Sequence, residues 1–345
     1  MTRIRNVAFL KSSNLRLLLR EILKHQPISK AALAKRLHVG HSTVVQLLKP
    51  LIDRKIVVES MLGDSTGGRP PKLLSMNPDA AYGIVVDLSG HKIRVALMNC
   101  VLSIVTVSNL DADSDIYSTL ESIVNVCNHL KEQANDVRIL GLCVAISGVM
   151  DPATGKISSS LIEGLGNVRL VDYLREKLSL PIVVENDANL SALGEFMKME
   201  KEVNNMFYIH MGEGLGGGLI IDRSIFRGDR GYAGEIGKIL YDPQTFRTVG
   251  DVYSHLVRSS SHSEDEIVRL LSTIVLNVVS VLDIVNFVVG GTMFDISEKT
   301  LSKVETEVEQ HFYGFNVEVR KSKKHPDAML IGAMEYLMEN VLTNL

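Results

Sequence analysis

The fold is decided by residues 212–238, which read GEGLGGGLIIDRSIFRGDRGYAGEIGK. An apolar run that begins at Met206 leads into this stretch, and the pattern predicts hairpin strands around a glycine-rich turn. We expect this hairpin to open the second half of a larger body, whose first half lies upstream in the chain.

Upstream of the hairpin, strand-like runs surround a long helical pattern. The apolar periodicity predicts three strands, a helix and two further strands, over residues 82–88, 92–98, 102–108, 116–135, 139–145 and 182–184. Downstream, long apolar helices lead to one more strand over 286–289. The order βββ followed by αβα occurs roughly twice, which predicts an α/β body of two lobes, 77–200 and 201–345. A cleft between two such lobes is a natural site for a small molecule.

Residues 1–76 predict a different unit, an α+β winged helix-turn-helix domain with its linker. Leucine and isoleucine at helical spacing predict a helix over 14–24, and Ser29 is placed to cap a second helix. From Lys30 onward, apolar anchors and a small residue fall where a helix-turn-helix requires them. His38 stands at the turn position often given to glycine, and histidine is a residue that can adopt the left-handed conformation there.

The second helix of this motif is predicted to begin near His41 and to present polar side chains outward. The candidates for contact with the DNA major groove are His41, Ser42, Thr43, Gln46 and Lys49. Gln46 can pair with adenine through two hydrogen bonds, whereas Lys49 suits a backbone phosphate. Pro50 is expected to bend or shorten the helix at its C-terminal end.

A strand over 56–59, a glycine-rich turn over 63–68 and a returning strand over 72–74 predict the wing. Arg69 stands between two glycines and two prolines and is a candidate for the minor groove. An ordinary interdomain linker is the alternative for this stretch. The charge favours DNA, because residues 1–72 hold 14 Lys and Arg against 4 Asp and Glu, a net +10, whereas the remainder carries −13.

The composition indicates a soluble globular protein with more than one domain. The chain has 345 residues, of which 46% are hydrophobic and 22% are charged. Polar residues interrupt the most apolar stretch, 273–289, and no apolar leader with a cleavage site follows the N-terminus, so we expect no membrane association and a cytoplasmic location. Cys100, Cys127 and Cys143 lie far apart, which predicts buried thiols rather than disulfides or metal ligands.

Three motifs are specific in combination. They are the helix-turn-helix followed by STGGRPP at 65–71, the run ENDAN at 185–189, and the glycine-rich stretch 212–238. Together they resemble the ROK family of repressors and sugar kinases, and the resemblance covers essentially the whole chain. It implies an actin-like ATPase fold for the body, double-stranded operator DNA and a sugar effector as partners, and a homodimer or a dimer of dimers.

The resemblance also implies a sugar site. Asn186 and Asp187 would face sugar hydroxyls, and in the kinase members Asp187 would be the general base, because phosphoryl transfer to an alcohol needs a carboxylate that accepts its proton. Glu235 would accept hydrogen bonds from other hydroxyls, and Ser147 and Gly148 would approach the sugar through their backbone. Without the resemblance, such an acidic cluster after a strand would be interpreted as a solvated loop.

One departure from the family pattern argues against ATP as a cofactor. Kinase members have a phosphate loop of the form Asp-x-Gly-x-Thr, whereas this chain has DLSGH, from Asp87 through Gly90 to His91. The loop has lost one glycine and the threonine hydroxyl, both of which contact phosphate. Glycines remain where other nucleotide contacts would lie, and close packing explains them equally; they are Gly214, Gly216, Gly290 and Gly291.

A second departure concerns zinc. The family's zinc site takes a histidine at the position of Lys238 and three cysteines shortly after it, but residues 239–260 contain no cysteine. We therefore expect no metal. Lys238 in a sugar pocket could pair with Asp187 or Glu235, or bind an anionic ligand such as a sugar phosphate.

These observations favour a sugar-responsive DNA-binding transcription regulator, a repressor of carbohydrate-metabolism genes that releases or rearranges on DNA when a sugar binds the cleft. One alternative is an active sugar kinase that also carries a DNA-binding domain. Another is a regulator that has lost ligand sensing and binds DNA constitutively, although the retention of Asn186, Asp187 and Glu235 argues against it.

Overall fold

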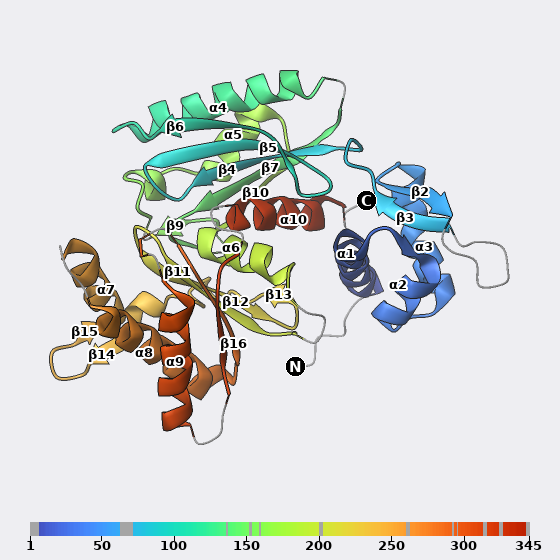
Figure 1. The fold of residues 1–345 in the computed structure, drawn as a ribbon. Helices are drawn as coiled ribbons and strands as arrows, with labels where there is room; N and C mark the ends of the chain where they lie inside the picture. The colour runs from blue at the N-terminus through green and yellow to red at the C-terminus, as the bar shows by residue number, and fades with distance from the viewer. Residues whose placement is uncertain are drawn as a thin grey trace.

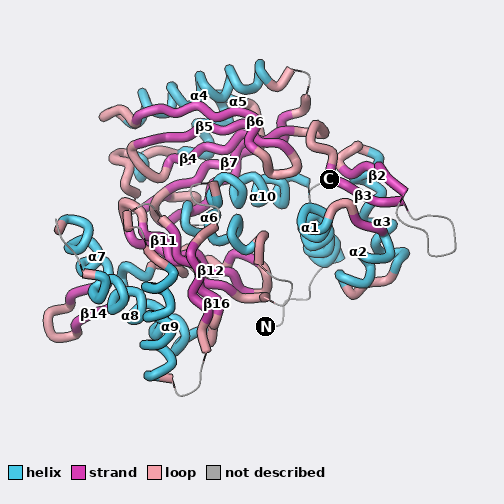
Figure 2. The backbone as a smooth tube through the Cα atoms, viewed as in Figure 1, coloured by secondary structure: helices cyan, strands magenta, loops and turns pink. Residues whose placement is uncertain are grey.

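An N-terminal domain lies beside a larger body of two lobes (Figures 1 and 2). This arrangement comes from a computed structural model that describes residues 7–62, 72–135, 137–151, 154–158, 160–199, 203–259, 263–291, 293–294, 296–312, 316–323 and 327–342. Within these ranges, no helix is both long enough and apolar enough to cross a membrane. The predicted α/β class of the body is confirmed by two five-stranded sheets with helices packed on their faces.

The N-terminal domain contains three helices and a three-stranded sheet. The helices are α1 (Val7–His25), α2 (Lys30–Leu37) and α3 (His41–Asp53), and the strands are β1 (Ile28–Ser29), β2 (Val57–Leu62) and β3 (Lys72–Met76). The antiparallel pair β2 and β3 forms the stem of the predicted wing. The turn of that wing, including Arg69, lies outside the described residues.

Local signals in the sequence fix the helix-turn-helix. Ser29 caps α2 by accepting a hydrogen bond from the Ala32 amide at 3.1 Å, and His38 ends this helix in the left-handed conformation with φ of 54°, as predicted. The prediction that Pro50 shortens the next helix is wrong, because α3 continues through it to Asp53. Leu48 and Leu51 on either side of the proline are buried and anchor this last turn in the core.

The first lobe is built on a mixed sheet with the strand order β10-β7-β4-β5-β6. Its strands are β4 (Tyr82–Leu88), β5 (Lys92–Asn99), β6 (Ile104–Asp111), β7 (Ile139–Ile146) and β10 (Ile182–Asn186), and a small hairpin of β8 (Val149–Met150) and β9 (Ile157–Ser158) follows β7. Helices α4 (Ile116–Gln133) and α5 (Leu170–Leu178) cover one face, where Ile84 and Val86 of β4 pack against them. Val85 points to the opposite face, as alternation along a strand requires.

The second lobe has the strand order β13-β12-β11-β16-β17. Its strands are β11 (Met206–Met211), β12 (Leu215–Ile221), β13 (Ser224–Ile225), β16 (Asn286–Gly290) and β17 (Glu318–Lys321). The antiparallel pair β11 and β12 is the predicted hairpin around the glycine-rich turn. One face packs against α7 (Val249–Arg258), α8 (Glu264–Leu282) and α9 (Glu298–His311), and a two-stranded sheet of β14 (Leu240–Asp242) and β15 (Arg247–Thr248) precedes α7.

Two helices, α6 (Asp187–Phe196) and α10 (Ala328–Leu342), lie between the two sheets (Figure 1). Helix α6 packs on β11 and β12 of the second sheet, and α10 packs on β4 and β7 of the first. The helices cross at Gly194 and Gly332, where an added Cβ would clash with the carbonyl oxygens of Ala328 and Leu190. Only glycine at both positions allows this close approach of the two backbones.

The position of α10 does not follow the predicted division of the body at residue 200. This helix comes after the strands of the second lobe in the chain, yet it packs on the first sheet. Its apolar side chains, among them Leu330, Met334 and Leu337, share one hydrophobic core with the inner face of that sheet. Leucines of the N-terminal domain, including Leu18, belong to the same core, so this domain is joined to the body by continuous apolar packing.

A buried ion-pair cluster joins α1 to α10 within this interface. Arg20 of α1, only 6% exposed, contacts the carboxylates of Glu335 and Glu339, the latter at 2.6 Å, and donates a hydrogen bond to the carbonyl of Arg223 in the second lobe. Burial raises the pKa of Glu335 to about 8, although Arg20 acts in the opposite direction. Arg20 therefore offsets part of the free-energy cost of burying these two carboxylates.

Arg20→Ala is expected to lower the melting temperature in differential scanning calorimetry. It would leave Glu335 buried without the cation that it contacts, and removing one partner of a buried pair costs about 3–5 kcal/mol. Lys92→Ala is the control, because it breaks an ion pair with Asp111 in which the side chains are 85% and 72% exposed. Equal losses in the two variants would show that the α1–α10 cluster does not stabilise the fold.

Candidate functional site

A cavity of about 390 Å³ lies between the two lobes. The ends of β4, β10 and β11, the start of α6 and the β11–β12 turn build its wall, which includes Asp87, Gly90, Ser147, Gly148, Asn186, Asp187, His210, Glu213, Gly214, Gly216 and Glu235. Strands β4, β7 and β10 are parallel, so their carboxyl ends meet at one edge of the sheet, the usual place for a ligand in α/β proteins. Most of the predicted sugar-site residues are therefore brought together here.

Asn186 organises the first-lobe wall of the cavity. It is the N-cap of α6, where its side-chain oxygen accepts a hydrogen bond from the Asn189 amide at 3.0 Å. Its side-chain nitrogen donates to the Gly148 carbonyl at 3.0 Å, which holds the loop of Ser147 and Gly148 against the cavity. Gly148 has φ of 116°, a conformation that favours glycine.

Asp187 is the first residue of α6 and its side chain is 14% exposed. Burial, with a smaller contribution from the neighbouring carboxylate of Asp87, raises the pKa of Asp187 to about 7. Glu235 of the second lobe also lines the cavity, and burial raises its pKa as well. A sugar hydroxyl could donate to these carboxylates when they are ionised, or accept from Asp187 when it is protonated.

His210, which the sequence analysis missed, lines the cavity beside Asp187. Its Nε2 lies 4.0 Å from Asp187 Oδ2, and its Nδ1 is buried without a hydrogen-bond partner among the described residues. Burial lowers the pKa of His210, so the imidazole is mainly neutral near pH 7. The sequence signal for it was a polar residue in an otherwise apolar strand, MFYIHM at 206–211.

Glu185, directly before Asn186, faces away from the cavity. Its Oε2 accepts a hydrogen bond from Arg227 Nε at 2.6 Å and its Oε1 accepts one from Asn189 Nδ2 at 2.9 Å. The Arg227 guanidinium also lies over the ring of Tyr336 on α10, 5.4 Å from its centroid. Glu185 therefore holds the start of α6, the second lobe and α10 together rather than contacting a ligand.

Lys238 does not take the position predicted for it. It is exposed and is absent from the cavity lining, although Glu235, three residues earlier, is part of it. Its charge still acts on Glu235, where it lowers the pKa of the carboxyl against the larger, raising effect of burial. The donor set for zinc is also missing from the described residues, which contain no group of three or more His, Cys, Asp or Glu able to hold a metal ion.

The residues predicted for nucleotide contact fall into two groups. Asp87, Gly90, Gly214 and Gly216 line the cavity, whereas Gly290 and Gly291 do not. A Cβ at Gly290 would clash with the Tyr208 hydroxyl, and Gly291 has φ of 114° against the backbone of Met211. Close packing thus explains this last pair of glycines.

Carboxylates flank the loop after β4. Asp87 already accepts hydrogen bonds from the Ser89 amide at 3.2 Å and the Ser89 hydroxyl at 2.5 Å. Opposite this loop, a Cβ on Gly90 would lie 3.1 Å from Oε1 of Glu213, a carboxylate that the sequence analysis also missed. A polyphosphate chain between the loops would meet these carboxylates.

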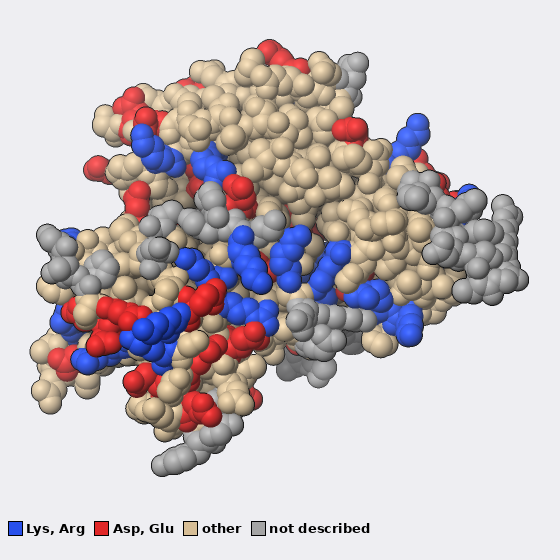
Figure 3. Space-filling view, in the orientation of Figure 1, with Lys and Arg blue, Asp and Glu red and all other residues tan. Residues whose placement is uncertain are grey.

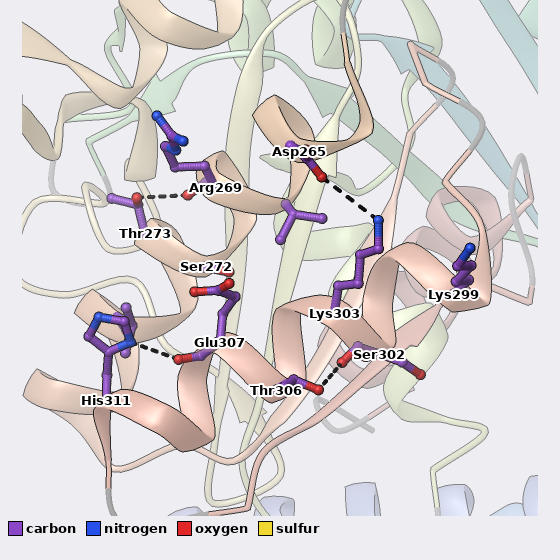
Figure 4. Close-up of a pocket in the computed structure, with 12 residues that line it drawn as sticks. Asp265, Arg269, Ser272, Thr273, Lys299, Ser302, Lys303, Thr306, Glu307 and His311 are labelled. Carbon is purple, nitrogen blue, oxygen red and sulfur yellow. Dashed lines mark hydrogen bonds and ion pairs between the residues drawn. The ribbon is translucent and has the colours of Figure 1, made fainter.

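A second hollow, of about 740 Å³, lies between α8 and α9 (Figure 4). Both cationic and anionic side chains line it, and Lys303 already contacts Asp265 at 3.8 Å. It shares no lining residue with the interlobe cavity and contains none of the predicted site residues. The interlobe cavity is therefore the better candidate for ligand binding.

Helix α3 presents the predicted DNA contacts on its outer face. His41, Ser42, Gln46 and Lys49 are exposed and Thr43 is half-buried, whereas Val44 and Leu47 are buried. Figure 3 shows Lys and Arg side chains in a band across the middle of this view that extends toward the N-terminal domain. Contact of these α3 residues with DNA stays a prediction.

Comparison with known proteins places the body in a family. Residues 83–250 match the model of the ROK family. The chain is 32% identical over 237 residues to the xylose repressor of Caldicellulosiruptor bescii and 30% identical over 244 residues to that of Bacillus subtilis strain 168. These matches cover 67% and 69% of this chain and 59% and 63% of the two relatives, so the chain spans about three fifths of their length.

Solved structures of ROK family proteins have a fold similar to that of this chain. A ROK family transcriptional regulator, a homolog of the E. coli MLC protein, superposes with a TM-score of 0.75 at 18% identity over 97% of this chain and 98% of its own. A ROK family glucokinase from Streptomyces griseus, solved with glucose and AMPPNP, gives a TM-score of 0.59 at 20% identity over 74% of this chain and 99% of its own. The predicted fold class and resemblance are confirmed: the chain belongs to the ROK family.

Proposed function

We propose that this chain is a sugar-responsive transcriptional repressor that binds operator DNA through α3 and releases or rearranges on it when a sugar occupies the interlobe cavity. One observation carries the proposal, the continuous packing from the cavity to the DNA-binding domain. Helix α6 begins at Asp187, crosses α10 at Gly194 and Gly332, and α10 in turn holds Arg20 of α1.

The proposed partners follow from the relatives and from geometry. Two relatives carry the name xylose repressor, which supports a monosaccharide effector and makes D-xylose the first sugar to test. A single winged helix covers too little DNA for tight specific binding, which supports a homodimer or a dimer of dimers. We propose no cofactor, because the loop at 87–91 and the carboxylate of Glu213 disfavour ATP, and Lys238 replaces a zinc ligand.

The mechanism we propose is a shift between two arrangements of the lobes. A sugar that contacts Ser147 and Gly148 at the end of β7 in the first lobe and Glu235 in the second favours the closed arrangement, because only that arrangement offers both contacts. Closure rotates α6 about its fixed crossing with α10, and the rigid attachment of α1 to α10 transmits this rotation to α3. In a dimer, the distance between the two α3 helices must match half-sites about 34 Å apart, so a small rotation weakens operator binding.

Variants in α3 test the DNA contacts. Lys49→Ala is expected to weaken binding to all DNA and to reduce the salt slope of the binding constant by about 1, because it removes one phosphate contact. Gln46→Ala is expected to weaken only binding to an operator selected from a random library, by about 1–3 kcal/mol. Fluorescence anisotropy at several salt concentrations measures both effects. Lys177→Ala, which removes an exposed cation from α5, is the control. An unchanged salt slope in Lys49→Ala would exclude a contact between Lys49 and a DNA phosphate.

Asp187→Asn tests the effector site. Neutral sugars, beginning with D-xylose, are expected to raise the melting temperature of the native chain and to release the selected operator, and both effects should be absent in Asp187→Asn. Asp242→Asn, in an exposed turn of the second lobe, should behave like the native chain. A sugar response that persists in Asp187→Asn would place the effector elsewhere, and sugar-dependent ATP turnover would instead favour a kinase.

The pKa of Asp187 predicts how the sugar-free protein responds to pH. This pKa is about 7 in the folded chain, whereas an unfolded Asp titrates near pH 4. Between these values the folded chain retains a proton that the unfolded chain has lost, so stability falls as pH rises from about 4 to about 7. Asp187→Asn is expected to melt at a higher temperature than the native chain at pH 8 and to show a flatter decline from pH 5 to 8. A lower melting temperature at pH 8 in calorimetry would refute this assignment.

A further inference from the structure

Val45 is an exposed apolar side chain on α3, the helix to which DNA binding is assigned above. It is 42% exposed, whereas the preceding residue, Val44, is fully buried. Over residues 14–59 and 72–76, the parts of the N-terminal domain whose side chains the structure describes, no other large apolar side chain is exposed. A single exposed valine is common on a protein surface, so the significance of Val45 depends on what surrounds it.

The neighbours of Val45 on the surface of α3 are predicted DNA contacts. Residues three and four apart are neighbours on a helix. Ser42 lies three residues before Val45, and His41 and Lys49 lie four residues before and after it, all of them exposed. Val45 is therefore an apolar group inside the polar face that α3 presents outward.

The charge of this face supports DNA as the partner that covers it. Residues 1–72 carry a net charge of +10. Within α3 the only acidic residue is Asp53, the last residue of the helix, so no carboxylate lies near Val45 along the helix. Phosphates line both edges of the major groove, and a helix face without acids can enter it.

The major groove offers one apolar group that suits Val45. Thymine places its C5 methyl group there, whereas the other groups on the base edges are mainly hydrogen-bond donors and acceptors. The side chain of Val45 ends in two methyl groups and has no polar atom, so it can pack against this methyl group but cannot pair with a donor or acceptor. The next residue, Gln46, can pair with adenine, and the two side chains together therefore favour A·T base pairs.

We propose that Val45 packs against the C5 methyl group of a thymine and that each operator half-site therefore has an A·T pair facing the N-terminal half of α3. This inference rests on the proposed function, because it specifies a base that the same helix recognises. The contact removes apolar surface of both groups from water. For one methyl group this effect corresponds to about 4-fold in affinity.

Uracil in place of thymine tests the contact, because uracil lacks the methyl group and keeps every hydrogen-bonding group of the base. The probe is the duplex that the full chain selects from a random library, with each thymine of a half-site replaced in turn and binding measured by fluorescence anisotropy. At one thymine in each half-site, uracil is expected to weaken binding of the native chain by about 4-fold. In Val45→Ser, the same replacement should change binding by less than about 2-fold, because the apolar contact is already lost.

Val107→Ser is the matched control. It changes a valine that is 39% exposed on β6 of the first lobe, and it should keep the full penalty for uracil. Val45→Ser is expected to melt at the same temperature as the native chain, because the side chain is exposed and serine has a helix propensity similar to that of valine. The uracil series on the native chain tests the inference without any variant.

The outcomes separate this inference from the function on which it rests. A selected half-site in which no thymine is sensitive to uracil overturns the inference but leaves a DNA-binding repressor in place. A uracil penalty of the same size in Val45→Ser and the native chain also overturns it, because the methyl group then contacts another part of the protein. If selection enriches no sequence, the proposed function fails and the inference fails with it.

Discussion

The close crossing of α6 and α10 is the constraint on which the rest of the structure depends. At Gly194 and Gly332 each backbone occupies the space that a side chain would need, so the two helices have one separation. Helix α6 covers the second sheet and α10 covers the first, and the lobes are therefore positioned through this contact. The cavity lies at one end of α6, and the docking surface for the N-terminal domain lies on α10.

Charged side chains are buried at both ends of this arrangement, but they are balanced differently. At the docking surface, Arg20 faces two carboxylates and the cluster holds α1 in place. In the cavity, burial and then the neighbouring carboxylate of Asp87 raise the pKa of Asp187. Such uncompensated acids destabilise the sugar-free form, and hydrogen bonds from a ligand can offset this cost. The same acids that weaken the empty fold are thus the ones suited to binding a sugar.

Sequence reasoning succeeded where local interactions decide the structure. Ser29 and His38 act on residues within one helical turn, so their spacing alone predicted a capped helix and a left-handed stop. The family motif brought Asp187 and Glu235 to one cavity because it preserves the elements that carry them. The packing of α10 could not be predicted, since it depends on contacts such as Arg20 with Glu335, 315 residues apart. His210 and Glu213 were missed for a related reason, because their significance arises only when the turn after β11 faces the end of β4.

The late position of α10 in the chain has a consequence for biosynthesis. During translation the N-terminal domain emerges first, but the helix that receives α1 and covers β4 and β7 is made after nearly all the rest. Until then, the inner face of the first sheet and the leucines of α1 remain exposed to water and to other chains. A nascent polypeptide that stalls before residue 328 would carry the helix-turn-helix without the helix that joins it to the body, and a large apolar surface open to aggregation.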